Sequence, residues 1–495
     1  MASSVVCALD VGTTGTRALL LNRRAEVVAS AYREVELQYP QPGWVEQDPA
    51  EIWSKTEGAL AEALATAGLT GHDVAAIGVT NQRETTILWE RTSGKPVYPA
   101  IVWQDRRTIA ICEAWRAQSK EAFTAPTGLV VDPYFSGSKL AWLFQHEPAW
   151  RRRAEKGELA FGTVDSWIAW NLTGGRAHVT DASNASRTLL YDIDRGVWSP
   201  DLLERTAIPA AILPRVCDTR GPFGVTAGLR ALPDGVPLLA MCGDQQASLF
   251  GQLLTEPGEW KATYGTGGFL LALLGDKAVR TPDALTSVAW SVKGKRTYYL
   301  EAAVFVCGAA LQWLRDGLRL FRDYSEMEAL LAQGQGHASG LFCVPAFTGL
   351  GTPFWDPRAR GLLLGITRAT SAGDVCMATL EGVAFEMQAA AAALSSDVPP
   401  RRYVADGGAT RSARLMQFQA DILQVPVSVS AWQEGTGLGA GFLAGLEAGF
   451  WTSVDELKAL APNHTVYRPQ FDAAQASALC TRWQAAAQRS LDWAE

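Results

Sequence analysis

The sequence has none of the features expected of membrane, secreted or nucleic-acid-binding proteins. In its 495 residues, no stretch approaches the ~18 consecutive apolar residues of a membrane helix. The apolar run at residues 5–9 is too short for a signal-peptide core and has no basic flank. No basic stripe balances the formal net charge of −7, which argues against a nucleic-acid-binding surface. We therefore expect a cytoplasmic protein that neither inserts into membranes nor binds nucleic acid.

Signals for metal sites, disulfides and common nucleotide motifs are also sparse. The five histidines show no metal-ligand spacing, so no zinc site is expected. The eight cysteines occur singly, mostly in apolar runs, as expected of buried thiols in a reducing compartment. GxxxxGK[ST] is absent, which argues against a P-loop enzyme. The glycines at 435–441 resemble a dinucleotide-binding turn, but no suitable strand precedes them, so we expect a closely packed helix at 436–448.

What is present indicates a compact α/β protein of two domains. The length favours two or three domains, and strands alternate with helices along the chain. Asp48, Pro49 and Glu51 predict a helix start, and that helix should end near Ala67 at Gly68. We expect buried strands at 74–80 and 85–89, and a long amphipathic helix at 374–394.

A Gly/Thr-rich turn between two strands occurs twice. The first copy, at 10–16, separates apolar strands at 5–9 and 17–22, and the second, at 265–268, interrupts the apolar run 260–274. This repetition predicts an internal structural repeat, with domains at 1–250 and 251–495. A third glycine turn, at 406–409, follows another apolar strand.

These turns are suited to binding phosphate. Glycines let the backbone approach an anion, and successive N–H groups and threonine hydroxyls can surround phosphate oxygens. Asp10, at the end of the first strand, could hold Mg²⁺ directly or through water. One such turn alone would more often be an ordinary hairpin, but two copies suit a nucleotide held between related domains.

Two longer patterns resemble the signatures of the FGGY carbohydrate-kinase family. The first is Tyr134-x-Ser136-x-x-Lys139 with its continuation to 146, and the second is the pair of segments 361–366 and 374–381. The resemblance covers nearly the whole chain and is strongest to the members that phosphorylate glycerol. Further matching segments are 42–46, 81–86, 101–104, 163–167, 184–188, 243–246 and 345–351.

The resemblance implies two ribonuclease-H-like domains of the actin/Hsp70 ATPase type, with the active site in the cleft between them. It also implies transfer of the ATP γ-phosphate to glycerol, with Mg²⁺, by a homo-oligomer (dimer or tetramer). By matched position, the nucleotide would contact Thr13, Thr14, Gly15, Arg17, Thr266, Gly308, Gln312, Gly408 and Ala409. Glycerol would contact Arg83, Glu84, Trp103, Tyr134, Asp244, Gln245 and Phe269.

The chemistry of these residue types agrees with that assignment. Glycerol needs hydrogen-bond partners for three hydroxyls, which Arg83 and Glu84 can supply, and an aromatic wall, which Trp103 and Phe269 can form. Taken alone, Arg83 and Glu84 would more often be a surface ion pair. Asp244 follows the apolar run 236–242, at the end of a strand where ligands gather in α/β sheets. It is the predicted catalytic base, and the alternative is an ordinary helix cap for residues 245–249.

The sequence departs from the family pattern at two places. Ala413 stands where the family usually has asparagine, which affects the expected contact with adenine. Residues 224–236 lack the Gly- and Lys-rich loop with which some relatives bind fructose 1,6-bisphosphate. The alternatives are a sister kinase for a pentulose, gluconate or erythritol, an actin- or Hsp70-like ATPase, and a catalytically inactive sugar-binding module.

Overall fold

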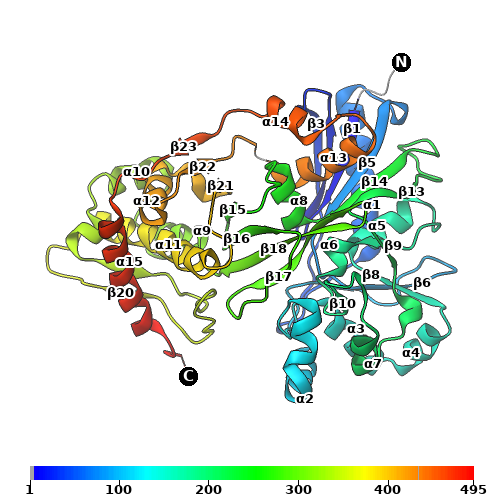
Figure 1. The fold of residues 1–495 in the computed structure, drawn as a ribbon, viewed down its shortest axis with the longest axis horizontal. Helices are drawn as coiled ribbons and strands as arrows, with labels where there is room; N and C mark the ends of the chain where they lie inside the picture. The colour runs from blue at the N-terminus through cyan, green and yellow to red at the C-terminus, as the bar shows by residue number, and fades with distance from the viewer. Residues whose placement is uncertain (1–4, 433, 495) are drawn as a thin grey trace.

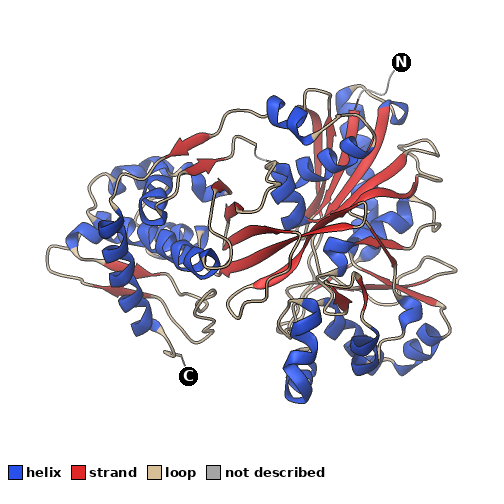
Figure 2. Ribbon diagram, in the orientation of Figure 1, coloured by secondary structure: helices blue, strands red, loops and turns tan. Residues whose placement is uncertain are grey.

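The computed structural model describes residues 5–432 and 434–494, and within them thirteen strands form one continuous sheet with helices on both faces (Figure 2). From one edge to the other, the strands are β23 (Thr465–Tyr467), β22 (Val427–Val429), β21 (Arg402–Asp406), β15 (Glu259–Tyr264), β16 (Gly268–Gly275), β18 (Lys295–Val304), β17 (Leu285–Val292), β13 (Arg220–Val225), β14 (Pro237–Gly243), β5 (Val74–Asn81), β1 (Val5–Val11), β2 (Gly15–Leu21) and β3 (Val27–Glu34).

The two halves of this sheet have the same topology. In the first half, β1, β2 and β3 form an antiparallel meander, and β5 and β14 continue the sheet in parallel from β1. In the second half, β15, β16 and β18 are antiparallel neighbours in the same places, although β17 lies between β16 and β18 in the chain, and β21 and β22 continue in parallel from β15. With the additional strands β13, β17 and β23 set aside, both halves show the order 3-2-1-4-5 of a ribonuclease-H-like fold, which confirms the predicted fold class and internal repeat.

The principal helices are α1 (Pro49–Ala67), α2 (Ile109–Thr127), α3 (Ser136–His146), α5 (Val164–Leu172), α6 (Ala182–Ala185), α8 (Asp244–Gly251), α9 (Gly308–Gln312), α11 (Ala372–Ser395), α12 (Ala413–Leu423), α13 (Gly435–Glu447) and α15 (Ala473–Ala487). Helices such as α1, α5, α11 and α13 pack on the sheet, whereas α2, α3 and α15 pack mainly on other helices and on small two-stranded sheets. None of the helices at 5–432 and 434–494 is long and apolar enough to cross a membrane.

Local signals placed most elements correctly. The Asp48 side chain accepts a hydrogen bond from the Ala50 N–H at the start of α1, and Gly68 ends the helix in the left-handed region. The strand expected at 85–89 is wrong at its start, because β6 runs from Ile87 to Glu90. Glu84 has a φ of 61°, and the Thr85 N–H donates to the Arg83 carbonyl at 2.7 Å, so the chain turns sharply before β6 begins.

Helix α13 belongs to the second half of the sequence but packs on the first half of the sheet. It contacts β1, β5, β14 and α8, and in Figure 1 the orange helix lies beside the blue strands. Its glycines make this approach possible, since a Cβ at Gly437 would collide with Leu19 and one at Gly439 with the Ala247 carbonyl. The predicted close helix packing is confirmed.

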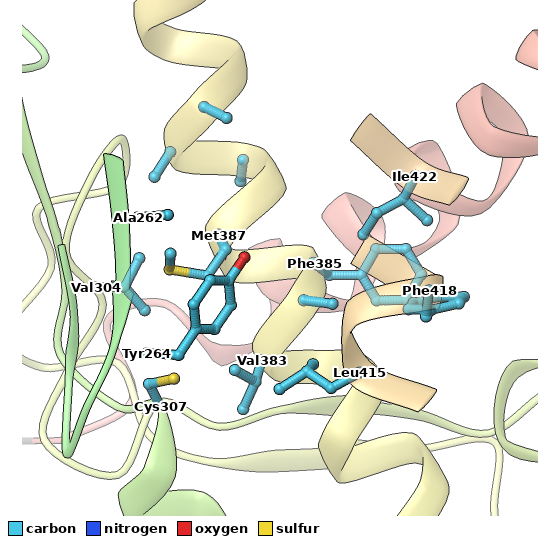
Figure 3. Close-up of a cluster of buried hydrophobic side chains, with 14 of the residues drawn as sticks. Ala262, Tyr264, Val304, Cys307, Val383, Phe385, Met387, Leu415, Phe418 and Ile422 are labelled. Carbon is cyan, nitrogen blue, oxygen red and sulfur yellow. The ribbon is translucent and has the colours of Figure 1, made fainter. Parts of the chain in front are cut away.

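The core of the second half supports the ends of β15 and β21. The Tyr264 ring lies beside α11, next to Met387 (Figure 3). Its hydroxyl lies 3.0 Å from the Tyr403 hydroxyl and donates to the Gln419 Oε1 at 2.9 Å. These bonds connect the end of β15, where the second glycine turn begins, to the start of β21 and to α12.

Candidate active site

The carboxyl ends of β1, β5 and β14 meet at one edge of the first half-sheet. Asp10 on β1 is opposite Thr80 on β5, and Gly243 on β14 is opposite Asn81. Asp10 and Asp244 therefore come from the ends of two strands that lie on either side of β5. Burial raises the pKa of Asp10 to about 7, with further contributions from the Asp244 and Glu434 carboxylates against an opposing effect of Arg17.

The first Gly/Thr turn is held by side chains of the first half. The Gly12 N–H donates to the Gly15 carbonyl at 2.9 Å, which closes the turn. Trp103 Nε1 donates to the Thr13 hydroxyl at 2.9 Å, and Gln47 Nε2 donates to the Thr13 carbonyl at 2.7 Å. Thr14 is exposed at the tip. Thr13, Thr14 and Gly15 thus form one preorganised loop.

Arg17 connects this loop to the second half of the chain. Its guanidinium pairs with the Glu434 carboxylate, directly before α13, and stacks over the Tyr32 ring with 5.3 Å to the centroid. Arg17 therefore lies at the boundary of the two halves, beside the first loop.

The second Gly/Thr turn is held by backbone bonds instead. The N–H groups of Cys307 and Ala309 donate to the Thr266 carbonyl at 2.9 and 3.1 Å, and the Gly308 N–H donates to the Gly265 carbonyl at 2.7 Å. Thr266 and Gln312 are exposed, whereas Gly308 is half-buried. The start of α9 and the second turn therefore form one unit that contains Thr266 and Gly308, with Gln312 at the end of α9.

The third glycine turn lies beside the second one. Strands β15 and β21 are parallel, with Thr263 opposite Asp406, so both turns emerge from the same edge. Gly407 has a φ of 97°, and a Cβ there would collide with the Tyr264 backbone. Gly408 is exposed and Ala409 half-buried at the start of a 3₁₀ turn, Gly408–Arg411. Ala413, the first residue of α12, has only a methyl group where a side-chain amide was expected.

Arg83 is the centre of a buried charge cluster. Only 3% of its side chain is exposed, and its Nε lies 3.1 Å from an Asp244 carboxylate oxygen. Its Nη1 donates to Glu301 at 2.8 Å and to the Tyr299 hydroxyl at 3.0 Å. Glu84 is 1% exposed and accepts from Arg187 Nε at 2.6 Å. Arg83 and Glu84 are therefore buried groups and not the surface ion pair that they would suggest in isolation.

Asp244 is partly open to solvent although its surroundings are buried. It is the first residue of α8, after Gly243 at the N-cap position, and its side chain is 31% exposed. One carboxylate oxygen accepts the Gln245 N–H at 2.6 Å and lies beside Arg83. Burial raises the pKa of Asp244, and the positive charge of Arg83 opposes that rise.

Aromatic rings lie beside this carboxylate–arginine pair. The rings of Trp103 and Tyr134 meet edge to face at 5.5 Å, and Arg83 Nη2 lies 3.4 Å from the Tyr134 hydroxyl. Because Trp103 also bonds to Thr13, the aromatic wall and the first loop are directly connected. Gln245 is half-buried, and at 5–432 and 434–494 its Oε1 finds no hydrogen-bond partner.

Phe269 comes from the second half and lies on the face of the sheet turned toward Arg83. It is opposite Ala303 on β18, and Leu271 is opposite Glu301. Because alternate residues of a strand share a face, Phe269 and Glu301 lie on the same side. Glu301 contacts Arg83, so this face meets the first half.

The sequence patterns did not single out Glu301, Tyr299 or Arg187 as site residues. Arg187 lies inside the matching segment 184–188, but no role was expected for it. Glu301 is the lone charge in the apolar run from Tyr298 to Val304, and a charge in a buried strand is the signal that could have identified it.

Comparisons with known proteins agree with this architecture. Residues 5–251 match the N-terminal domain of the FGGY family of carbohydrate kinases, and residues 260–448 match its C-terminal domain. The glycerol kinase of Trichlorobacter lovleyi is 49% identical over 99% of this chain and 100% of its own length. The glycerol kinase of Deinococcus radiodurans is 47% identical over 99% of this chain and 98% of its own.

Solved structures give the same result. The crystal structure of Plasmodium falciparum glycerol kinase with ADP superposes with a TM-score of 0.93 at 32% identity, and covers 99% of both chains. The xylulose kinase of Rhodospirillum rubrum superposes with a TM-score of 0.88 at 30% identity, and covers 98% of both. The duplicated fold, the phosphate-type turns and these matches together show that the chain belongs to the FGGY family of carbohydrate kinases.

Proposed function

We propose that this chain transfers the γ-phosphate of ATP to a terminal hydroxyl of glycerol, giving sn-glycerol 3-phosphate and ADP. The observation that carries the proposal is the small polar site around Asp244, where Arg83, Tyr134 and Trp103 converge next to the first phosphate-type loop. The relatives with 47–49% identity over nearly the whole chain are glycerol kinases, which supports the same substrate here.

In the proposed site, glycerol lies against Trp103, Tyr134 and Phe269, and its hydroxyls bond to polar groups around them. Arg83, Glu84 and Gln245 supply donors and acceptors, and the unpartnered Gln245 Oε1 in the described chain is an acceptor ready for a hydroxyl. Arg83 and Glu84 are almost completely buried, so their orientation is fixed before substrate arrives. We expect a rigid site lined by these side chains to favour a three-carbon polyol over a longer sugar.

Asp244 is the proposed catalytic base. Phosphoryl transfer passes through a loose transition state, so the protein mainly positions groups while a carboxylate orients the alcohol and accepts its proton. Arg83 holds one Asp244 oxygen at 3.1 Å, and the partly exposed side chain can present the carboxylate to a substrate hydroxyl. Because protonated Asp244 cannot accept that proton, the rate should fall as the pH drops through the pKa of Asp244.

The proposed nucleotide site combines the three glycine turns. Thr13, Thr14, Gly15 and Arg17 would face the phosphates from one side, with Thr266, Gly308, Gln312, Gly408 and Ala409 on the other. Backbone N–H groups in such turns bind phosphate oxygens. The halves 1–250 and 251–495 are the proposed domains, with α13 packed across their boundary.

Asp10 is the proposed Mg²⁺-binding residue, and its surroundings fit that ion. Its buried carboxyl group has a raised pKa partly because other carboxylates lie near it, and a divalent cation would relieve that repulsion. In the part of the chain that the structure describes, no cluster of three or more protein ligands occurs. This agrees with Mg²⁺, which is commonly held by one or two carboxylates together with phosphates and water. The ion would neutralise charge on the ATP phosphates.

The experiment that tests the proposal is an ADP-release assay with Mg²⁺-ATP and a panel of acceptors. We expect much faster release with glycerol than with xylulose, ribulose, gluconate or erythritol. If ADP is released faster with one of those acceptors, that acceptor and not glycerol is the substrate, and the assignment to the FGGY family still holds. The xylulose kinase with a TM-score of 0.88 makes a pentulose the first alternative to include. Rapid ADP release without any acceptor would favour an ATPase instead.

A further inference from the structure

Glu301 is a charged residue in the centre of the substrate region that comes from the opposite half of the chain. It lies on β18, 3% exposed, whereas its arginine partners follow β5 and α6 of the first half. Its Oε2 accepts from Arg83 Nη1 at 2.8 Å, and its Oε1 accepts from Arg187 Nη2 at 3.1 Å. One carboxylate therefore bridges two arginines across the boundary between the halves.

The remaining groups around Glu301 keep it ionised and fixed. The Tyr299 hydroxyl donates to its Oε2 at 3.1 Å. Burial would raise the pKa of Glu301, but the charges of Arg187 and Arg83 outweigh it and lower the pKa to about 2. Arg187 is itself held by Ser287 at 3.1 Å and by Glu84 at 2.6 Å. Glu301 is thus a permanent negative charge with one orientation.

This arrangement decides which way the Arg83 guanidinium points. Glu301 and Tyr299 bind its Nη1, which leaves Nε directed to Asp244 at 3.1 Å, while the separation from Glu84 is 3.9 Å. Without the Glu301 charge, the guanidinium would be attracted to Asp244 and Glu84. Arginine binds a carboxylate most strongly with two parallel hydrogen bonds, so Arg83 would then close on the groups that should meet the substrate.

We propose that Glu301 is a positioning residue for the reaction: it holds Arg83 in the orientation that binds the polyol, from the half of the chain that also carries the second phosphate turn. The inference rests on the proposed glycerol site. It makes the affinity for the polyol depend on how β18 meets the first half, and it gives Glu301 no contact with the reacting atoms.

Glu301→Gln tests the proposal, because the amide keeps the size of the side chain and removes its charge. We expect the KM for glycerol to rise ~10-fold or more, since a charge-assisted hydrogen bond is lost, while the KM for ATP stays within about twofold. Isothermal titration of the nucleotide-free protein with glycerol should show the same loss. A variant with an unchanged KM for glycerol, or with both KM values raised equally, would overturn the proposal.

Two further variants separate positioning from general damage. Glu386→Gln is the matched control, a buried glutamate on α11 that pairs with no arginine in the described chain, and it should leave the KM for glycerol unchanged. Tyr299→Phe removes only the hydroxyl that bonds Glu301 and Arg83, and should raise the KM for glycerol about 2- to 5-fold, less than Glu301→Gln does, because the charge of Glu301 and its direct bond to Arg83 remain.

If Glu301→Gln does not fold, Tyr299→Phe tests the proposal in its place. A KM for glycerol in Tyr299→Phe equal to that of wild type would then overturn the proposal. Wild-type protein assayed beside the variants distinguishes the two hypotheses. If wild type does not phosphorylate glycerol, the proposed function is wrong. If it does and the variants bind glycerol normally, only the role of Glu301 is wrong.

Discussion

The two halves share one strand order but differ in where the chain between the strands is long. In the first half, residues 82–236 connect β5 to β14 and contain Arg83, Trp103, Tyr134 and Arg187. In the second half, only residues 407–426 connect the equivalent strands, and the long segment, 305–401, lies between β18 and β21 and contains α9 and α11. The shared topology places phosphate-type turns in both halves, and the long connection of the first half contains most of the residues proposed to bind the polyol.

The two phosphate-type turns also differ in the groups that hold them in place. Side chains of Trp103 and Gln47 hold the first turn, whereas backbone N–H groups of residues 307–309 hold the second. A turn held by backbone bonds tolerates changes of side chain, whereas the turn held by Trp103 is connected to the aromatic wall proposed to contact the polyol. The comparison therefore predicts that the first half carries the catalytic base and the coupling between the two substrates, and that the second half binds part of the nucleotide and positions Arg83.

The strongest test of this difference is Asp244→Asn. The amide can still bond to a hydroxyl but cannot accept its proton, so turnover should fall by roughly 10²–10⁴-fold while folding and nucleotide binding persist. Steady-state rates and nucleotide titration measure the two effects. Asp234→Asn, at an exposed turn of the same half, is the matched control. If Asp244→Asn keeps turnover within about threefold of wild type, Asp244 is a helix-end residue and not the base.

The second test compares buried carboxyl groups that pair with arginine in the first half with a buried carboxyl group of the second half that does not. Glu84 and Asp244 are paired with arginines, but the Oε1 of Glu386 has no partner among the described residues, and burial raises its pKa well above 4.5. The folded state therefore keeps a proton that the unfolded chain loses, so wild-type stability falls as pH rises above 4.5. Glutamine does not titrate, so Glu386→Gln does not show this loss. Its free energy of unfolding should therefore rise relative to that of wild type by about 1.4 kcal/mol for each pH unit above 4.5.

Denaturant unfolding at pH 6, 7 and 8 measures this gain for Glu386→Gln. Glu381→Gln is a useful contrast, because Glu381 is also buried but bonds to His337 at 2.7 Å, so its replacement should destabilise the protein. A constant difference between Glu386→Gln and wild type across this pH range would mean that Glu386 is ionised in the folded state.

The third test addresses the connection between the wall and the first turn. Trp103→Phe keeps an aromatic ring but removes the Nε1 donor to Thr13. Losing one hydrogen bond from a preorganised loop should raise the KM for ATP up to about tenfold, and the altered wall should raise the KM for glycerol as well. Trp53→Phe, on α1 of the same half, is the control for a general tryptophan effect. An effect on only one of the two KM values would show that Trp103 does not couple the two sites.

Local patterns in the sequence predicted most of the fold, because the deciding interactions are short in range. The cap residues Asp48 and Gly68 bounded α1, and the duplicated turns revealed the repeat. The start of β6 was misplaced because the left-handed Glu84 turns the chain, and propensity does not show such a turn. The packing of α13 on the opposite half depends on contacts between residues far apart in the sequence, from Gly439 and Ala247 to Gly437 and Leu19, so its glycines predicted close packing but not its partner.

The site was predicted less completely than the fold. Residues in matching motifs could be named, and the structure brings Arg83, Asp244, Tyr134 and Trp103 together as expected. Glu301 was missed because its partners Arg83 and Arg187 lie 218 and 114 residues away. A lone charge in a buried strand indicates that some partner exists, but only the three-dimensional contact identifies it.

The smallest expected effect lies in the second half, at Ala413. This residue begins α12, next to the third glycine turn, and its methyl group has no hydrogen-bonding capacity. Ala413→Asn supplies an amide where the FGGY pattern usually has one. If the adenine ring binds there, one added neutral hydrogen bond should lower the KM for ATP about three- to fivefold without changing the KM for glycerol. Ala413→Ser, whose shorter side chain reaches less far, is the control. If the KM for ATP is the same in Ala413→Asn as in wild type, the adenine ring binds elsewhere. A change in the KM for glycerol would contradict the division of roles between the two halves.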